Sequence, residues 1–525
     1  MINPVSHADL LLATADQSRE ADRQTIESFG IPGQTLMEIA GNRAADIILE
    51  NIAANRIESA TVLLVCGKGN NAGDAFVIAR ILVSAGHRIA LLPVFGTNGL
   101  SDDAGLNYNR LMKLCGEMEV EVPVYEEWPA GEVFDLIIDA VFGTGLEREV
   151  KSPLSDFFER INRSGVPVCA LDIPSGIHSD TGEVMGIAIR AEMTLQFGIR
   201  KAGCYLGEGP VYCGERKLVS LPFPPVYKKD IRVRLVDLEP DPLQMLRVGN
   251  VTTADDNGPY ARVRKHKYNN GVVHVIGGSA GLTGAPVHAG KAAWSLGMGA
   301  VSLHYPSAWA IPMESLVPQL IKKPWGGAAA EFFTEEDADV VLDYLREKEG
   351  VTVIGPGLGR HEQTMAFVRR VVARHAGPMI IDADALHAFR GHEQVLADRR
   401  HPGSVILTPH PGELAAITGK KSGTDYGRLV DTRDLARKLN CVVLAKGNPV
   451  IVHSSPESTS LVTPYDTNPF SRAGFGDILA GHLAAFLTRT RQPLQSCEFA
   501  LVYGFKKLSE VTAAGKSFPE PSDLS

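Results

Sequence analysis

The stretch SRAGFGDILAG, from Ser471 to Gly481, places a Gly-Asp step directly before a helical pattern that continues as DILAGHLAAFL. A helix N-terminus carries unpaired N–H groups and the positive end of the helix dipole, so it attracts anions. Asp477 could therefore cap this helix, as aspartate often does. Alternatively, a phosphate binds the N–H groups while Asp477 takes a proton from a substrate hydroxyl. The rest of the sequence has to decide between these two interpretations.

Short apolar runs alternate with helical patterns along the chain. In the C-terminal half, each run leads into a loop that contains glycine or proline: GVVHVIGGS (271–279), VTVIGPGLG (351–359), PMIIDADAL (378–386), SVILTPHPG (404–412) and CVVLAKGNP (441–449). The N-terminal half has four similar runs: TVLLVC (61–66), RIALLPV (88–94), FDLIIDA (134–140) and VPVCALD (166–172). Apolar runs separated by helices are typical of parallel sheets covered on both faces. The sequence therefore predicts an α/β fold with functional loops at the carboxyl ends of the strands.

The chain, with 525 residues, is too long for one ordinary core, so we expect more than one domain. From about Leu221 the alternation gives way to LPFPPVYKKDIRVRLVDLEPDPL, whose proline and charge content is typical of a joint between domains. We therefore expect an N-terminal domain at 1–222, a linker at 223–250 and a C-terminal domain at 251–525. A helix near 15–28 is expected before the first strand.

The composition argues against several classes of protein. A net charge of −9 disfavours non-specific binding to nucleic acid, which requires clustered Lys and Arg. The seven cysteines are dispersed without a C-x-x-C pair, which is typical of reduced thiols rather than of disulfides or a zinc site. No apolar run reaches the roughly 20 residues of a membrane span, and no Lys or Arg precedes Arg19, so no secretion signal is expected. We expect a soluble cytoplasmic protein.

Three loops of the N-terminal half carry candidate binding residues. In VCGKGNNAGDAF, a glycine-rich loop lies between a strand and a helix, where close backbone approach and anion binding are possible. DAVFGTGLEREV, from Asp139, and LDIPSG, from Leu171, follow two further strands. The first loop alone could be no more than a tight strand-to-helix turn. Three such loops on one sheet edge predict a ligand pocket.

Together these loops resemble the NAD(P)HX epimerase domain, the YjeF N-terminal family, over about residues 8–222. The resemblance implies a Rossmann-like three-layer domain that interconverts the R and S forms of hydrated NADH and NADPH. Asp172 would be the acid/base, although a satisfied carboxylate at a strand end is the simpler interpretation, and Asn71, Asp139 and Ser175 would hold a potassium ion. The residues that would bind the hydrated dinucleotide are Asn70, Asn71, Ala72, Gly73, Asp74, Gly143, Thr144, Gly145, Leu146, Glu147, Arg148, Glu149 and Asp172.

The first loop departs from the family pattern G-x-G-N-N-G-G-D-G, because this chain has Ala72 and Ala75 where the family has glycine. If either position requires a positive φ, alanine there costs on the order of 1 kcal/mol. A non-catalytic N-terminal domain that binds or regulates is therefore an alternative to an active epimerase.

Six motifs follow one another in the C-terminal half: GGSAGLTGAPVHAGKAAWSLGMGAV, IGPGLGR, DADAL, LTPHPGEL, LAKGNPVIV and RAGFGDILAG. The series resembles the NAD(P)HX dehydratase domain, the YjeF C-terminal family of the ribokinase-like superfamily, over roughly residues 250–516. The resemblance implies that Asp477 is the catalytic carboxylate and that ADP, with Mg²⁺, is the phosphoryl donor and yields AMP and phosphate. The nucleotide would bind at Lys446, Gly447, Asn448, Pro449, Val450 and Gly476. The hydrate would contact Ala285, Gly357, His410 and Asp477.

Simpler interpretations stand beside these assignments. His410, between two prolines, could be a turn histidine bonded to the backbone, and Lys446 could be a solvated lysine at a strand end. Asp382 and Asp384 of DADAL could form a paired-carboxylate or magnesium site, or Asp384 could cap a helix.

The motif before Asp477 departs from the family run N-P-G-M-A-T-G-G-T-G-D. Here NPFSRAGFGD is one residue shorter between Asn468 and Asp477, introduces Arg472 and has Phe475 in place of threonine. The change to phenylalanine removes a hydroxyl donor beside the expected phosphate, and the charge of Arg472 could compensate.

The leading hypothesis is a bifunctional metabolite-repair enzyme, a homo-oligomer that acts on NADHX and NADPHX. One alternative is a ribokinase-like small-molecule kinase with a dinucleotide-binding module. Another is a dehydratase whose N-terminal domain is not catalytic.

Overall fold

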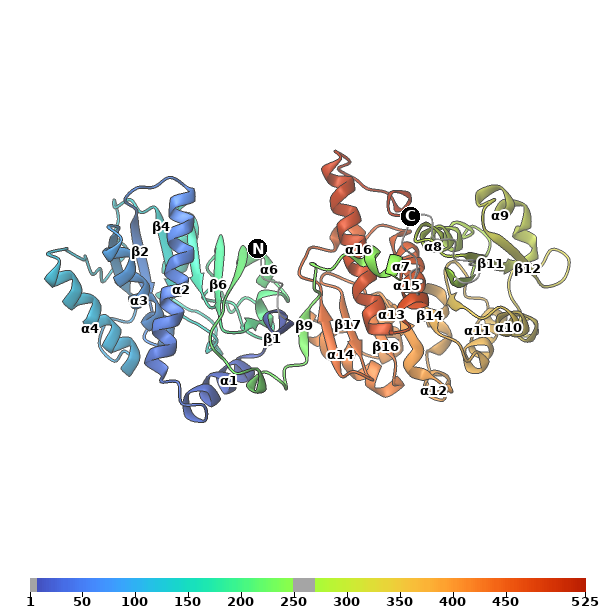
Figure 1. Cartoon of the computed structure of the whole chain (residues 1–525), viewed down its shortest axis with the longest axis horizontal. Helices are drawn as coiled ribbons and strands as arrows, with labels where there is room; N and C mark the ends of the chain where they lie inside the picture. The colour runs from blue at the N-terminus through green and yellow to red at the C-terminus, as the bar shows by residue number, and fades with distance from the viewer. Residues whose placement is uncertain (1–6, 249–269) are drawn as a thin grey trace, which may run out of the picture. The chain divides into compact units, whose positions relative to one another are not determined.

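The computed structural model of the chain describes residues 7–248 and 270–525, which form two compact units (Figure 1). The residues divide as follows: 1–233 with 424–426 in the first unit, and 234–423 with 427–525 in the second. The expected start of the C-terminal domain, at residue 251, lies outside the described residues.

The expected linker, residues 223–250, contains regular structure where it is described. β9 (Val233–Leu235) is the edge strand of the second unit's sheet, and the N–H of Val236 donates to the carbonyl of Val462. α7 (Pro242–Val248) follows it. Residues beyond Val233 therefore contribute an edge strand and a helix to the second unit.

The first unit is built on a parallel six-stranded sheet with the order β3-β2-β4-β5-β6-β8. Its strands are β2 (Thr61–Cys66), β3 (Arg88–Pro93), β4 (Leu136–Ala140), β5 (Val168–Leu171), β6 (Met193–Phe197) and β8 (Glu215–Val219). A short parallel pair, β1 (Leu12–Ala13) with β7 (Arg200–Lys201), accompanies it. The strand order changes direction between β2 and β4, and ligands of open α/β sheets bind at such a switch point.

Helices cover both faces of this sheet. They are α1 (Ala15–Glu27), α2 (Gly33–Ala54), α3 (Asn70–Ser84), α4 (Asp102–Glu117), α5 (Leu154–Arg163) and α6 (Gly209–Tyr212). α2, α3 and α4 pack together on one face (Figure 1). Phe158 and Ile161 of α5 enter a second apolar cluster with Leu63 and Val65 of β2, on the other face. The expected Rossmann-like three-layer arrangement is thus present.

The second unit contains a ten-stranded sheet with the order β12-β11-β10-β13-β14-β15-β16-β17-β18-β9. Its strands after β9 are β10 (Val272–Ile276), β11 (Ala300–Pro306), β12 (Ile321–Trp325), β13 (Val351–Ile354), β14 (Met379–Ile381), β15 (Val405–Leu407), β16 (Val442–Ala445), β17 (Ile451–Ser454) and β18 (Thr459–Val462). Pairing is parallel from β12 to β16 and antiparallel from β16 to β18. All nine apolar runs of the sequence contain a strand, which confirms the predicted α/β class.

The helices of the second unit after α7 lie on both faces of its sheet (Figure 1). They are α8 (Gly284–Ser295), α9 (Ala310–Leu316), α10 (Asp337–Glu347), α11 (Glu362–Arg374), α12 (Gln394–Ala397), α13 (Pro411–Thr418), α14 (Asp425–Leu439), α15 (Phe475–Thr490) and α16 (Pro493–Ala513). α8 and α15 pack closely: a Cβ on Gly481 would lie 2.2 Å from the carbonyl oxygen of Ala289. Small residues therefore permit the contact that places the start of α15 over the sheet.

Among the described residues, no helix has the length and apolar character needed to cross a membrane. All seven cysteines are buried and unpaired.

Candidate active sites

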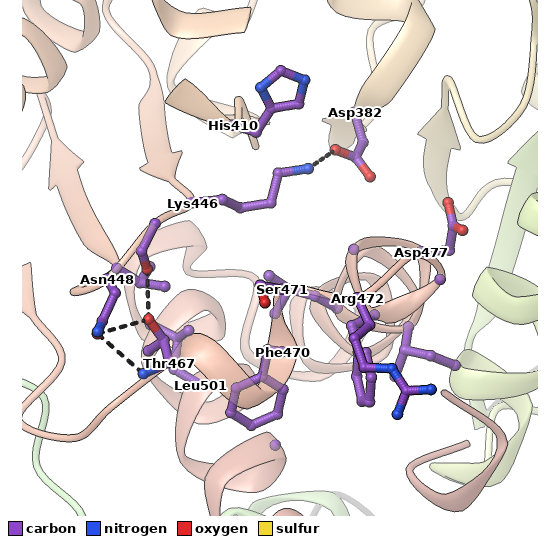
Figure 2. A pocket seen from close by; sticks show the side chains of 18 of the residues that line it. Asp382, His410, Lys446, Asn448, Thr467, Phe470, Ser471, Arg472, Asp477 and Leu501 are labelled. Carbon is purple, nitrogen blue, oxygen red and sulfur yellow. Dashed lines mark hydrogen bonds and ion pairs between the residues drawn. The ribbon is translucent and has the colours of Figure 1, made fainter. Parts of the chain in front are cut away.

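A cavity of about 600 Å³ in the second unit lies at the carboxyl ends of β14, β15 and β16. Asp382 directly follows β14, His410 comes shortly after β15, and Lys446 directly follows β16. The first turn of α15 adds Gly476 and Asp477, and Figure 2 shows the side chain of Asp477. The parallel sheet thus brings residues of four separate motifs to one edge.

Lys446 and Asp382 form an ion pair in this cavity (Figure 2). Lys446 Nζ donates to Asp382 Oδ1 at 2.7 Å, and the Thr408 hydroxyl donates to the same oxygen at 2.7 Å. Burial opposes the charge of Lys446, but the carboxylates of Asp382 and Glu413 outweigh it and hold the pKa of the lysine above its ordinary value. Lys446 is therefore a fixed cation in the site, and the interpretation as a solvated lysine is wrong.

Asp477 lies in the first turn of α15, and its carboxylate lines the cavity. The carboxylate makes no hydrogen bond or ion pair with another residue in the described part of the chain, and Gly474 occupies the N-cap position. Burial, with a contribution from the nearby charge of Asp382, raises the pKa of Asp477 to about 7. A half-buried carboxylate with this pKa is suited to general base catalysis near neutral pH, whereas the structure gives no support to a pure capping role.

His410 is the N-cap residue of α13. Its Nδ1 accepts the N–H of Gly412 at 3.0 Å, and the Glu413 carboxylate accepts the N–H of His410 at 2.8 Å. The turn-histidine interpretation therefore accounts for the backbone bond to Nδ1. His410 also lines the cavity. Burial raises the pKa of Glu413 to about 7, which adds a second carboxyl group that titrates near neutrality.

Asp382 and Asp384 do not form a paired-carboxylate site. Asp382 binds Lys446, whereas Asp384 accepts the N–H of Gly359 at 3.0 Å and Arg360 Nε at 2.9 Å. Asp384 thus holds the loop after β13, and no side-chain cap is formed at the start of the following helical turn. The paired-carboxylate and helix-cap interpretations are therefore wrong, whereas a magnesium site stays a prediction.

The expected nucleotide residues lie at the cavity with one exception. Lys446, Gly447, Asn448, Val450 and Gly476 line it, and Pro449 does not. The loop between β16 and β17 is held by further bonds: the Thr467 hydroxyl donates to the carbonyl of Gly447 at 2.6 Å, and Asn448 Oδ1 accepts the N–H of Thr467 at 3.1 Å (Figure 2).

Two expected hydrate contacts, Ala285 and Gly357, lie beside each other but do not line this cavity. Gly357 has a φ of +63°, and a Cβ there would lie 3.2 Å from the Cβ of Ala285 and 2.3 Å from the carbonyl oxygen of Leu282. The glycine is therefore required where the loops after β10 and β13 meet.

An apolar wall completes the cavity and was not anticipated from the sequence. It includes Tyr465, Phe470, Leu501 and Gly504. The hydroxyl of Tyr465 donates to the carbonyl of Leu501 at 2.9 Å. The glycine in ALVYGFKKL is the signal that could have found this wall, because a glycine on a helix leaves room for a neighbouring side chain, here the ring of Phe470.

The first unit has a cavity of about 740 Å³ at the carboxyl ends of β2, β4 and β5. Of the expected dinucleotide residues, those that line it are Asn70, Asn71, Asp74, Gly143, Thr144, Gly145 and Asp172. Ala72, Gly73 and the segment 146–149 do not line it. Ala72 is buried in the core, Leu146 is partly buried in an apolar cluster, and Glu147, Arg148 and Glu149 are exposed.

Ala72 and Ala75 occupy ordinary helical positions in α3, and neither has a positive φ. Both side chains are fully buried against neighbouring helices and strands. The loss of glycine at these positions therefore carries no backbone strain, and it does not argue against catalysis in this unit.

The three expected potassium ligands gather around one loop. Asn71 Nδ2 donates to the carbonyls of Phe142 and Leu171 at 3.0 and 3.1 Å. The Ser175 hydroxyl donates to Asp139 Oδ1 at 2.6 Å and accepts the N–H of Phe142 at 2.9 Å. Asn71 Oδ1 is buried and has no hydrogen-bond partner among the described residues. An unpartnered buried carbonyl oxygen, with the Asp139 carboxylate joined to the same loop through Ser175 and Phe142, fits a cation that takes oxygen ligands.

Asp172 forms an ion pair with Lys201 and lines the cavity of the first unit. Asp172 has a left-handed backbone with φ +68°, a strained conformation that is often found at functional sites. Lys201 is 2% exposed, and its Nζ also donates to the carbonyl of Phe197 at 2.7 Å. Asp172 is thus a partnered carboxylate, as the simpler interpretation states, and it also faces the cavity.

Asp22 and Asp74 line the same cavity, and the charges of Asp172 and Lys201 affect the pKa values of both carboxyl groups. Burial, followed by the charges of Asp172 and Asp22, raises the pKa of Asp74 well above its ordinary value. Burial also raises the pKa of Asp22. Neither Lys201 nor Asp22 was anticipated; the signal for Lys201 is the Arg200-Lys201 pair within the stretch QFGIRKAGCYLG, whose other residues are mostly small or apolar.

Comparison with known proteins decides the family. Residues 33–203 match the model of the YjeF-related protein N-terminus, and residues 273–508 match the model of NAD(P)H-hydrate dehydratase. The chain is 32% identical over 506 residues to the bifunctional NAD(P)H-hydrate repair enzyme Nnr of Salinibacter ruber, and the match covers 94% of this chain and 90% of that protein. The chain belongs to the family of bifunctional NAD(P)H-hydrate repair enzymes.

Other relatives show the same breadth of similarity. The repair enzyme Nnr of Escherichia coli is 28% identical over 93% of this chain and 88% of its own length. Among solved structures, an ADP/ATP-dependent NAD(P)H-hydrate dehydratase from Bacillus subtilis, co-crystallised with ATP and Mg²⁺, is 22% identical with a TM-score of 0.41, over 54% of this chain and 94% of that one. By family, this chain is a bifunctional enzyme with a YjeF-related N-terminal unit and a hydrate-dehydratase C-terminal unit.

Two residues in which this repair enzyme departs from the family motif, Phe475 and Arg472, have defined contacts in the structure. Phe475 is 3% exposed and packs edge-on against Phe470, with ring centroids 5.8 Å apart. The Arg472 side chain points away from Lys446 and Asp382 (Figure 2), and its guanidinium donates to the carbonyl of Pro519 at 3.0 Å. Arg472 lines the cavity, but its guanidinium is directed at Pro519 rather than at Lys446 and Asp382.

Proposed function

We propose that the chain repairs hydrated NADH and NADPH in two steps, with one step in each unit. The first unit interconverts the R and S hydrates, and the second converts the S hydrate to NADH or NADPH with consumption of ADP. The observation that carries this proposal is the Asp477 carboxylate, which lies in the cavity near the ion pair of Lys446 and Asp382 and has no partner among the described residues.

The dehydration requires a better leaving group than hydroxide. Asp477 takes the proton of the hydrate's hydroxyl, whose oxygen attacks the β-phosphorus of ADP, and AMP leaves. The ring-nitrogen lone pair then expels phosphate from the neighbouring carbon, and loss of the adjacent ring proton restores the dihydropyridine. Phosphoryl transfer depends mainly on positioning and charge stabilisation, and the fixed ammonium of Lys446 supplies positive charge at this edge of the sheet.

Magnesium fits this cavity as an ion that would be coordinated mainly by the phosphates of the nucleotide. Asp382, Glu413 and Asp477 line the cavity, but the described residues contain no cluster of three or more His, Cys, Asp or Glu that could hold a metal alone. Mg²⁺ commonly binds through one or two carboxylates plus phosphates and water, and it would neutralise phosphate charge here.

Epimerisation requires departure and return of one hydroxyl. The ring nitrogen expels the hydroxyl of one hydrate, water adds to the other face of the ring, and Asp172 exchanges the proton with the oxygen. Lys201 holds the Asp172 side chain at the cavity by the ion pair. The neighbouring Asn71, Asp139 and Ser175 would hold K⁺, which would supply positive charge to substrate oxygens.

The thermal unfolding temperature of the protein is expected to be higher in a potassium salt than in the same concentration of a tetramethylammonium salt. Asn71 Oδ1, its proposed ligand, is otherwise buried without a hydrogen-bond partner in the part of the chain that the structure describes, at a cost on the order of 1–3 kcal/mol. In Asn71→Ala this rise should be lost. Asn70→Ala is the matched control, because Asn70 accepts a bond from the Ser101 hydroxyl outside the proposed site. If potassium raises the unfolding temperature of Asn71→Ala as much as that of wild type, Asn71 is not a ligand of the ion.

Separated R and S hydrates of NADH, each incubated with the full chain and either ADP or ATP plus Mg²⁺, test the proposed function. We expect both hydrates to be converted to NADH with ADP, with one AMP and one phosphate released per NADH. Clearance of the S form alone, beyond spontaneous epimerisation, would show that the first unit is not catalytic. A stable phosphorylated thiazole or pyrimidine alcohol, formed with ATP, would instead support a small-molecule kinase.

Two further expectations belong to this proposal. The dispersed, unpaired cysteines support a cytoplasmic location. A homo-oligomer is also proposed, and size-exclusion chromatography with light scattering tests it.

A further inference from the structure

Residues 516–525, named here the C-terminal tail, lie against the start of α15. Leu524 is 2% exposed and lines the same cavity as Asp477. It forms a small apolar cluster with residues of α8 and of the segment around the start of α15: Ala292, Phe470, Phe475 and Ile478. The match to the dehydratase family model ends at residue 508, before the tail begins.

Two contacts join the tail to the shortened loop before α15. The Arg472 guanidinium donates to the carbonyl of Pro519 at 3.0 Å. Gly474 has a φ of +93°, and a Cβ there would lie 2.8 Å from the ring of Pro521. Since a side chain at this position would collide with Pro521, the tail packs directly on the loop backbone.

A third contact joins the tail to the body of α15. His482 is 1% exposed, and its ring lies edge-on to Tyr503 with centroids 4.8 Å apart. A carbonyl oxygen can only accept, so His482 Nε2 carries a proton and donates it to the carbonyl of Leu524 at 3.1 Å. Both the side chain and the backbone of Leu524 are therefore held.

The tail also keeps its own conformation. Lys516 Nζ pairs with Asp523 Oδ2 at 2.7 Å, and the Asp523 carboxylate accepts the N–H of Glu520 at 2.6 Å. The tail is thus a folded turn rather than a loose end, and it presents Leu524 to the cavity.

We propose that the C-terminal tail is a wall of the nucleotide cavity and that Leu524 and Arg472 are positioning residues for ADP. They fix the loop whose backbone leads into the first turn of α15, where Gly476 and Asp477 meet the phosphate. Both departures from the family pattern contact this tail: Phe475 shares an apolar cluster with Leu524, and Arg472 donates to the carbonyl of Pro519. The inference rests on the proposed use of ADP by this unit.

Steady-state kinetics of Leu524→Ala and Arg472→Ala test the proposal. We expect Leu524→Ala to raise the KM for ADP by about tenfold or more, with the KM for the hydrate and the epimerase rate unchanged. Phe518→Ala is the matched control, because this tail residue is 79% exposed and should behave as wild type. An unchanged KM for ADP in both Leu524→Ala and Arg472→Ala would overturn the proposal.

Limited proteolysis separates this inference from the proposed function. Trypsin can cleave after Lys516, and we expect wild-type cleavage there to be slowed by ADP with Mg²⁺ and to be faster in Arg472→Ala. Rapid cleavage of wild type that ADP does not change would contradict the proposal, whether or not hydrate is consumed. Failure of wild type to consume hydrate, with ADP still protecting the tail, would refute the proposed reaction and support the tail as a nucleotide wall.

Discussion

Asp477→Asn is expected to lower dehydratase turnover by at least about 100-fold, the scale of losing a general base, while ADP still binds. Asparagine keeps the shape of the side chain and can still serve at a helix start, but it cannot accept the hydroxyl proton. The measurement is kcat for NADH formation from the S hydrate, with ADP affinity from calorimetry. The epimerase rate of the first unit should not change.

The pH dependence provides a second test of this assignment. The pKa of Asp477 is raised to about 7, so the carboxylate that acts as base is formed above pH 7 and lost below it. kcat for dehydration should therefore rise with pH through about 7 and then level off. Glu413 titrates in the same range, so the profile should be repeated in Glu413→Gln, where the rise should persist.

A matched control is Asp434→Asn, which neutralises an exposed carboxylate of α14. It should leave turnover and the pH profile unchanged. If Asp477→Asn turns over as fast as wild type, Asp477 acts only at the start of the helix. The chemistry proposed for the second unit would then be wrong.

Lys201→Met should lower the rate of epimerisation by roughly 10- to 100-fold, the scale of a lost positioning or acid–base partner, and should destabilise the first unit. Lys201 is 2% exposed and pairs with Asp172. Removing one partner of a buried ion pair leaves the other charge uncompensated and costs roughly 3–5 kcal/mol. The measurements are exchange between R and S hydrates by chromatography, and chemical unfolding of the full chain.

A double variant separates structure from catalysis in this site. Lys201→Met combined with Asp172→Asn removes both charges, so it should recover much of the lost stability without recovering epimerisation. Lys217→Met is the control, because Lys217 lies on β8 of the same unit with a 36% exposed side chain. If Lys201→Met epimerises hydrates as fast as wild type, the ion pair has no part in the reaction.

Much of the fold could be predicted from the sequence, because fully buried parallel strands require apolar runs. Nine runs each contain a strand. Two of the strands that were not anticipated have weaker patterns: β12, IKKPW, is half exposed at the sheet edge, and β8, ERKLV, carries three charges. Edge strands have one solvated face or side, so their sequences need not be apolar.

The candidate sites were predictable where a motif follows a strand. Asp477, Lys446, His410 and Asn71 all line cavities at the carboxyl ends of parallel strands. Gly357 and the segment 146–149 follow strands too but line neither cavity, because the local pattern does not say toward which side a loop turns.

The sequence by itself determined the α/β alternation, the motifs at the strand ends and the family. Each of these depends on residues that are contiguous in the sequence, because their hydrophobicity and backbone freedom determine the local secondary structure. Only the tertiary structure decided that Lys446 pairs with Asp382, that Lys201 pairs with Asp172, and that Leu524 closes the wall beside Asp477. Such contacts join residues far apart along the chain, and their formation depends on which strands become neighbours and how helices pack on them.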